Sequence, residues 1–404
     1  MRTKLFFIIF TLLLVLSSCS ANKVVEYNYP DISKAETADK TGENVSESNA
    51  ELGTEAETDA DIVPEKLFNP YAYLNGMTLE EKVGQIFLAS CTSSDGAKDL
   101  AEHHWGGYIL FARDFKNETT ESFTAKIDSY QSASKIPLLI AVDEEGGDVC
   151  RVSMFGNFRE TQFLSPRDAF KVGGMDRLKQ EEWDKSLLLT SLGINVNMAP
   201  VCDISTERSA FMYRRSLGQS DTVTSEFVNF VTQINKMNKI GSVLKHFPGY
   251  GNNGDTHTDI VVDNRPMSEF ETKDLLPFYA GIKTDTAALL FSHTIVNCFD
   301  EKNPITLSEF AHKYVREVMG FKGVIVTDDM VMRGVTNKYG AEEAVILAVL
   351  AGNDLICSTD PVFHYNTVCD AVKSGRISVE VIDRAVIRVL TWKYNIGLIE
   401  PETK

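Results

Sequence analysis

The sequence predicts an α/β protein in which a single (β/α)8 barrel of the TIM type follows a lipoprotein signal and a disordered acidic linker. Three observations support this architecture. Eight short apolar runs alternate with longer helix-like stretches, polar residues follow nearly every run, and no repeat or second domain interrupts the sequence after residue 66. With 404 residues, 43% of them hydrophobic, the chain can bury a large core, which excludes a wholly disordered, collagen-like or multi-span membrane protein.

Residues 1–18 have the pattern of an export signal. Arg2 and Lys4 precede an apolar core of 12 residues, Leu5–Leu16. This core is shorter than the roughly 20 residues that span a bilayer. Two serines and Cys19 follow, as in a bacterial lipobox, so cleavage would make Cys19 the first residue and attach a diacylglycerol to its sulfur. The alternative is an ordinary secretory signal in which Cys19 is incidental.

Residues 19–65 form the predicted tether. Between residues 20 and 65, 12 acidic residues stand against three lysines, with small and polar residues between them. Such a segment buries too little apolar surface to offset its ordering entropy, so we expect it to stay flexible. The sequence therefore predicts an extracytoplasmic protein, lipid-anchored to the bacterial cell membrane. Its net charge of −17 argues against a nucleic-acid partner.

The barrel is expected to occupy residues 66–404. Buried parallel strands read as near-continuous apolar runs. The eight predicted strands are Val83–Leu88, Tyr108–Phe111, Leu138–Val142, Ile194–Met198, Ser242–Leu244, Ala288–Phe291, Val324–Val326 and Asp354–Cys357. The six cysteines beyond Cys19 show no close Cys-x-x-Cys spacing, so we expect structural thiols at Cys91, Cys150, Cys202, Cys298, Cys357 and Cys369.

The residues that end these runs predict one site. In (β/α)8 barrels the functional residues lie at the carboxyl ends of the strands, so polar groups that follow several strands should gather there. A single one of them would be read as a solvated turn or a helix cap. The groups are Arg113-Asp114, Asp143-Glu144-Glu145, Asp203, Lys245-His246, Ser292-His293, Asp328-Asp329 and Ser358-Thr359-Asp360.

The segment that follows the fifth run carries two histidines and an aspartate. Lys245 and His246 leave the strand, and Pro-Gly-x-Gly opens a flexible loop that leads to Asp255 and His257. An aspartate two residues before a histidine can fix the imidazole tautomer and raise its basicity. An Asx-turn beside a surface histidine would read the same way. A metal site made of His246, Asp255, His257 and Asp259 is a further alternative.

Two other segments place carboxylates at strand ends. In the seventh run, Asp328 should share the inward side of the strand with Val324 and Val326, while Asp329 caps the next helix or braces a neighbour. After the third run, Asp143 is followed by two glycines and by Arg151. The glycines would let the backbone approach a ligand closely. Asp143 and Arg151 suit hydroxyl binding, although an ordinary ion pair would look the same.

These residues together resemble glycoside hydrolase family 3, and within it the single-domain β-N-acetylglucosaminidases. The resemblance covers about residues 75–398. Further matches are Met77-Thr78-Leu79-Glu80-Glu81-Lys82-Val83-Gly84-Gln85, Ile109-Leu110-Phe111-Ala112-Arg113, Ala199-Pro200-Val201-Cys202-Asp203-Ile204, Arg215-Ser216-Leu217-Gly218 and Ala351-Gly352-Asn353-Asp354.

The resemblance implies a role for each matching residue. Asp328 matches the nucleophile of the family, His257 the acid/base of the N-acetylglucosaminidase branch, and Asp255 the partner of that histidine. The residues that match sugar-binding positions are Asp143, Arg151, Arg215, Lys245 and His246. No metal or organic cofactor is implied. Sibling β-glucosidases usually take a glutamate acid/base from a second domain, which this sequence lacks, so an acid/base histidine within the barrel is consistent.

Three positions depart from the family pattern. Tyr250 stands where Pro-Gly-His-Gly has histidine, the spacer before Asp255 has three residues in place of four, and Asp148 replaces a basic residue after Gly-Gly. We expect a retaining hydrolase that removes terminal β-linked N-acetylglucosamine from cell-wall or surface glycans, muropeptides among them, and acts as a monomer. The alternatives are a β-glucosidase, β-xylosidase or phosphorylase on the same barrel, and a non-catalytic glycan-binding lipoprotein.

Overall fold

A computed structural model describes residues 68–91 and 96–400. The predicted export signal, Cys19 and the acidic segment to residue 65 lie outside these residues. Among the helices that residues 68–91 and 96–400 form, none is both long and apolar enough to cross a membrane. The same residues contain no disulfide between the six cysteines beyond Cys19, in agreement with the sequence-based expectation.

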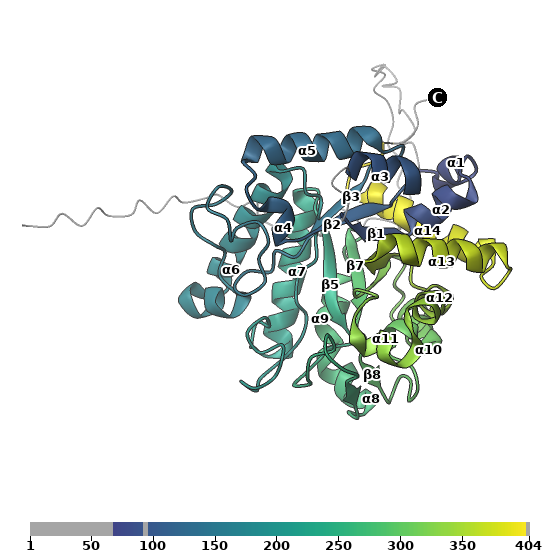
Figure 1. Cartoon of the computed structure of the whole chain (residues 1–404). Coiled ribbons are helices and arrows are strands. Elements are labelled where there is room, and N and C mark those ends of the chain that lie inside the picture. Colours follow the sequence, from purple (N-terminus) through teal and green to yellow (C-terminus); the bar gives the residue numbers. More distant parts are fainter. Residues whose placement is uncertain (1–67, 92–95, 401–404) are drawn as a thin grey trace, which may run out of the picture. The chain divides into compact units, whose positions relative to one another are not determined.

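Eight parallel strands form the barrel (Figure 1). Their order in the sheet is β10-β1-β2-β3-β4-β5-β7-β9, and a parallel bridge between Val326 and Leu355 joins the two end strands. The strands are β1 (Phe87–Ser90), β2 (Gly107–Leu110), β3 (Leu139–Val142), β4 (Val196–Asn197), β5 (Gly241–Phe247), β7 (Ala287–Phe291), β9 (Ile325–Thr327) and β10 (Ile356–Ser358). The predicted (β/α)8 barrel is therefore confirmed.

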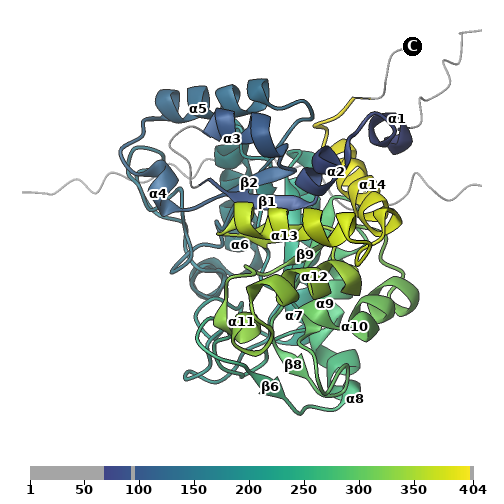
Figure 2. The ribbon, with the colours of Figure 1, turned by 45° about the vertical axis from the view of Figure 1, so that its right-hand side comes forward.

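Helices surround the strands, as Figures 1 and 2 show. They are α1 (Pro70–Leu74), α2 (Leu79–Gln85), α3 (Gly96–His103), α4 (Ala112–Phe115), α5 (Thr120–Ala133), α6 (Pro166–Ser191), α7 (Asp221–Met237), α8 (Met267–Glu269), α9 (Leu276–Gly281), α10 (Glu309–Lys313), α11 (Arg333–Tyr339), α12 (Ala341–Ala351), α13 (Pro361–Lys373) and α14 (Val379–Asn395). Short β6 (Val262–Asp263) and β8 (Ile295–Val296) pair beside the barrel, each in a segment that follows a barrel strand.

One predicted strand is displaced. The apolar run Val83–Leu88 was expected to be a strand, but its first half is the end of α2, and β1 begins only at Phe87. The reason lies upstream, where Thr78 and Glu81 form a capping box: Glu81 N donates to Thr78 Oγ1 at 3.2 Å, and Thr78 N donates to Glu81 Oε2 at 2.7 Å. This box starts a helix that continues to Gln85.

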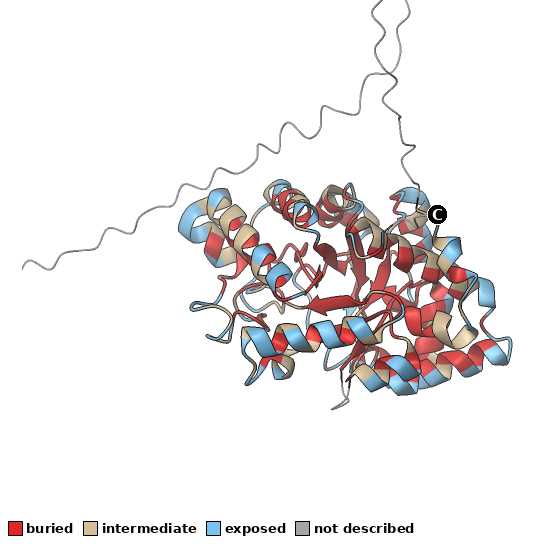
Figure 3. Ribbon diagram, turned by 90° about the horizontal axis from the view of Figure 1, so that it is seen from above, coloured by how far each residue is buried: buried red, intermediate tan, exposed pale blue. Residues whose placement is uncertain are grey.

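Alternating side chains divide the core into an inner and an outer layer. The inner layer fills the barrel and includes Val324 and Val326, whereas Ile325 between them packs outward against the helices. Figure 3 shows the barrel strands buried throughout and the helices exposed on their outward sides. This alternation decides which residues at the strand ends face the mouth of the barrel.

Candidate active site

A cavity of about 520 Å³ opens at the carboxyl ends of the strands. Its wall includes residues from, or just beyond, seven of the eight strands, all except β1, and the β9 residue continues the inward-pointing series of Val324 and Val326. These wall residues are Ile109, Phe111, Asp143, Met198, Lys245, Leu290, Asp328 and Cys357. The cavity is thus the open end of the barrel interior, where the apolar layer gives way to charged side chains.

The cavity brings the predicted site residues together. Seven of the eight line it, namely Asp143, Arg151, Arg215, Lys245, His246, His257 and Asp328. Asp255, the eighth, contacts His257. Their catalytic and binding roles remain predictions.

Not every polar strand end reaches this cavity, which corrects the expectation of a single site. Arg113 donates to Ser90 and lies over the Phe111 ring, 4.9 Å from its centroid, while Asp114 accepts from Phe111 N at 2.8 Å. Asp360 is exposed at the start of α13. Side chains at the strand ends alternate in direction, so a polar residue at such an end need not face the barrel mouth.

A buried group of two carboxylates and two cations forms one side of the cavity. Lys245 Nζ lies 2.6 Å from both Asp143 Oδ1 and Glu145 Oε1. The Arg215 guanidinium donates to both oxygens of Glu145, at 2.9 Å through Nε and 2.6 Å through Nη2. This fork geometry fixes the guanidinium plane, so Arg215 and Lys245 present their remaining hydrogens in set directions.

Charge pairing keeps Glu145 and Lys245 ionised. Burial by itself would raise the pKa of Glu145, but the charges of Arg215 and Lys245 outweigh it and hold that pKa far below its usual range. Burial would likewise lower the pKa of Lys245, but Asp143 and Glu145 raise it above its usual value. The cavity therefore holds fixed cations and carboxylates, which suit a ligand rich in hydroxyl groups.

Glu145 was expected at the strand ends together with Asp143, but the sequence assigned it no catalytic or binding role. Its neighbour Glu144 has a different role. Glu144 is buried and accepts from the backbone N–H groups of Arg151 and Val152, each at 2.8 Å. It thereby fixes the start of the loop from which Arg151 enters the cavity.

The two glycines after Glu145 are required by the packing of the protein itself. Gly146 has φ 101° and Gly147 has φ 65°, and a Cβ on Gly146 would lie 2.0 Å from the carbonyl oxygen of Leu164. The close approach that excludes a side chain is therefore made by the protein's own backbone, and no ligand is needed to explain it.

The carboxylate of Asp203 orients His246. Its Oδ2 lies 2.8 Å from His246 Nδ1 and accepts from His246 N at 3.1 Å, while its Oδ1 accepts from Tyr250 N at 2.7 Å. Because a carboxylate can only accept here, His246 carries a hydrogen on Nδ1 and turns Nε2 toward the cavity, 3.4 Å from Arg215 Nη2.

The two aspartates after β9 are used differently, as the alternation predicts. Asp328 lines the cavity and accepts from Asp329 N at 2.9 Å. Asp329 braces the neighbouring strand end, since its carboxylate accepts from Thr359 N at 3.0 Å and Thr359 Oγ1 at 2.7 Å. Burial would raise the pKa of Asp328, but the histidines around it, His293 first among them, bring that pKa below its usual value. Asp328 is thus an ionised carboxylate facing the cavity.

The loop after β5 supplies a second histidine–carboxylate pair at the cavity wall, and this pair, unlike His246 and Asp203, is partly exposed. His257 Nδ1 lies 2.5 Å from Asp255 Oδ1, and their side chains are 54% and 33% exposed. With Nδ1 donating to the carboxylate, Nε2 is the nitrogen that can exchange a proton with a ligand. The Phe211 ring lies beside the imidazole, 5.8 Å from it between centroids.

The alternative of a metal site gains no support. Within residues 68–91 and 96–400, no group of three or more histidine, cysteine, aspartate or glutamate side chains is placed to hold a metal ion. His246 and His257, two of the four suggested ligands, are each hydrogen-bonded through Nδ1 to an aspartate.

The basic side chain that the family pattern has at position 148 is supplied here by another loop. Asp148, which stands where the family pattern has a basic residue, pairs with Arg214 at 2.7 Å, and both line the cavity. A guanidinium therefore reaches the cavity rim beside position 148, although the chain supplies it from position 214.

Comparison with known proteins decides the family. Residues 78–392 match the glycosyl hydrolase family 3 N terminal domain. The chain belongs to glycoside hydrolase family 3. This family 3 chain is 30% identical over 268 residues to the beta-hexosaminidase of Nitrosomonas eutropha, covering 63% of this chain and 74% of that protein. It is 24% identical to the beta-hexosaminidase LpqI of Mycobacterium tuberculosis over 343 residues, 82% of this chain and 87% of that one.

A solved structure supports the same assignment for this glycoside hydrolase. The family 3 β-N-acetylglucosaminidase from Paenibacillus sp. str. FPU-7 superposes with a TM-score of 0.75 at 29% identity. The match covers 81% of this chain and 64% of that one, so this chain spans somewhat under two thirds of the Paenibacillus protein. The expected family and its N-acetylglucosaminidase branch are confirmed by these relatives.

Proposed function

We propose that this glycoside hydrolase removes terminal β-linked N-acetylglucosamine with net retention of configuration. The supporting observation is that an ionised carboxylate, Asp328, and a histidine held by a carboxylate, His257, line one cavity together with groups that suit hydroxyl binding. The names of the similar proteins point to the same substrate class.

In the first step Asp328 attacks the anomeric carbon and forms a glycosyl ester, while the glycosidic bond breaks and His257 gives its proton to the departing oxygen. In the second step His257 takes a proton from water, whose oxygen attacks the anomeric carbon and releases the sugar and the free carboxylate. Asp255 holds Nδ1 in both steps, so that Nε2 moves the proton. Asp143, Arg151, Arg215, Lys245 and His246 bind the sugar hydroxyls.

Hydrolysis of aryl β-N-acetylglucosaminide and aryl β-glucoside, measured at equal concentration, tests the substrate. We expect a strong preference for the N-acetyl sugar. A preference for the glucoside would replace the proposed substrate, and faster turnover with inorganic phosphate would make the protein a phosphorylase.

Two variants test the roles of the acid/base and the nucleophile. Asp328→Ala should lower kcat at least about a thousandfold, whereas Asp360→Ala, at an exposed strand end outside the cavity, should leave it unchanged. His257→Ala should cost about a hundredfold on substrates with poor leaving groups and little on activated aryl glycosides, because only the former need protonation. Equal losses on both would assign His257 a structural role.

We also propose that the protein is exported and anchored outside the cytoplasmic membrane by lipid on Cys19, with cell-wall fragments or surface glycans, muropeptides among them, as substrates. The basis is the signal-like sequence of residues 1–18 and the acidic composition of residues 20–65. In cells, Cys19→Ala should move the protein out of the membrane fraction or block its processing. Unchanged membrane attachment would contradict the lipid anchor.

A further inference from the structure

Tyr250 makes a buried contact with the loop that carries the proposed acid/base. Its hydroxyl lies 2.5 Å from Oγ1 of Thr256, and the two residues are 2% and 0% exposed. Thr256 is the residue between Asp255 and His257. A hydrogen bond to Thr256 therefore acts at the centre of the histidine–carboxylate pair.

Thr256 is held from a second side as well. Its carbonyl oxygen accepts from the backbone N–H of Gly334 in α11 at 3.1 Å. The approach is so close that a Cβ on Gly334 would lie 2.7 Å from that oxygen. Thr256 is thus fixed through its side chain by Tyr250 and through its backbone by α11.

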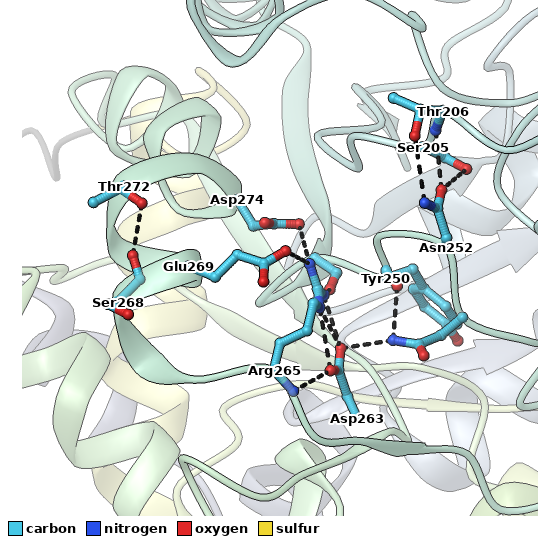
Figure 4. A network of polar contacts seen from close by, with 12 residues as sticks. Ser205, Thr206, Tyr250, Asn252, Asp263, Arg265, Ser268, Glu269, Thr272 and Asp274 are labelled. Atoms are coloured by element: carbon cyan, nitrogen blue, oxygen red, sulfur yellow. Dashed lines mark hydrogen bonds and ion pairs between the residues drawn. The ribbon is translucent and has the colours of Figure 1, made fainter.

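Tyr250 is itself fixed to the catalytic end of the barrel. Its backbone N–H donates to Asp203, the carboxylate that also orients His246, and its ring meets the His246 imidazole edge-on at 5.2 Å between centroids. The start of the loop is also held in place, since Asn252 Oδ1 accepts hydrogen bonds from Ser205 and Thr206 (Figure 4).

On the other side of Tyr250, an ion-pair network holds the chain that enters and leaves the loop. Figure 4 shows Arg265 beside Asp263 and Asp274, to which it pairs at 2.7 and 3.0 Å. Arg265 also donates to the carbonyl oxygen of Gly249 at 2.8 Å, immediately before Tyr250. Both the phenol and the loop base therefore have fixed positions from which the hydroxyl can hold Thr256.

We propose that Tyr250 is a positioning residue, whose hydroxyl holds Thr256 and so directs the Asp255–His257 pair toward the cavity. This inference rests on the proposed role of His257. It also accounts for two departures from the family pattern at once. The loop is one residue shorter than the pattern, and a phenol, which reaches further than an imidazole, stands where the pattern has histidine.

The test is a series of aryl β-N-acetylglucosaminides whose leaving groups span a wide range of pKa, hydrolysed by the full-length protein purified in detergent. Tyr250→Phe keeps the ring and removes the hydroxyl. We expect kcat/KM to fall about tenfold on the poorest leaving groups and less than about twofold on the most activated ones. Thr256→Val should show the same pattern, and the double variant should be no worse than either single one, since all three lose one hydrogen bond.

Tyr108→Phe is the matched control. Its buried hydroxyl donates to the carbonyl oxygen of Gly96 at 2.9 Å, away from the cavity, so this variant should show no dependence on the leaving group. A loss in Tyr250→Phe that is uniform across the series, or absent, would overturn the inference. If Tyr250→Phe does not fold, the dependence of the Thr256→Val losses on the leaving group tests the inference in the same way.

His257→Ala, measured in the same series, separates this inference from the proposed function. If its losses grow with leaving-group pKa while those of Tyr250→Phe do not, the inference fails and the role of His257 stands. If the losses of His257→Ala are uniform, the proposed role of His257 fails, and the positioning role of Tyr250 falls with it.

Discussion

Lys393 provides a prediction about stability whose size can be worked out from its surroundings. It lies in the last turn of α14, is fully buried, and donates through Nζ to Gln85 Oε1 at 2.9 Å. No carboxylate among residues 68–91 and 96–400 forms an ion pair with it. Burial alone therefore lowers the pKa of Lys393 from 10.5 to about 7.

The direction in which stability changes with pH follows from proton binding. Between pH 7 and 10.5 the unfolded chain keeps this proton while the folded protein releases it, so stability rises with pH across that interval. The fall of this pKa from 10.5 to about 7 corresponds to about 5 kcal/mol in full, most of which is recovered between pH 7 and 10. Charged Lys393 can draw water or a small local movement into its site, which offsets part of this free energy, so we expect the free energy of unfolding to rise by at least about 2 kcal/mol between pH 7 and 10.

Lys393→Met replaces the ammonium by an uncharged chain of similar length and removes this dependence. At pH 7 we expect the variant to have a higher free energy of unfolding than the unchanged protein. This difference should be smaller by at least about 2 kcal/mol at pH 10. Urea unfolding followed by tryptophan fluorescence at a series of pH values measures it, with the exposed Lys322→Met as control. A difference between Lys393→Met and the unchanged protein that is constant from pH 7 to 10 would refute the reasoning.

Two more predictions concern the active site. Glu145→Gln leaves Arg215 and Lys245 buried without the carboxylate they share, so urea unfolding should show a loss of about 3–5 kcal/mol; an unchanged midpoint would mean that water or Asp143 replaces it. Because the pKa of Asp328 lies below its usual 3.8 and only the ionised form attacks, kcat/KM, which reports the first step, should fall on acidification only below about pH 3.8; an acid limb of kcat/KM above pH 5 would contradict this assignment.

The amino-acid sequence was sufficient to predict the barrel and most of the charged and histidine side chains that line the cavity. Strand runs and their alternation are local properties with a period of two residues, so they could be read without knowing any partner. That is why Asp328 could be placed on the inward side with Val324 and Val326, and Asp329 against a neighbour. Even the displaced first strand had a local signal, since Thr78 and Glu81 have the spacing of a capping box.

Which charged groups neutralise one another depends on contacts between distant parts of the chain. Glu145 finds Arg215 70 residues further along the chain, and Lys245 still further, so no local spacing shows that it holds both. Lys393 reads as a basic residue in the last turn of a helix until α14 packs against α2 and buries it. In the sequence, Tyr250 is only a departure from the histidine of the family pattern. Its proposed role in holding Thr256 depends on the contact that the folded loop makes with it. Burial and charge pairing depend on which chain segments meet, and that is a property of the folded molecule.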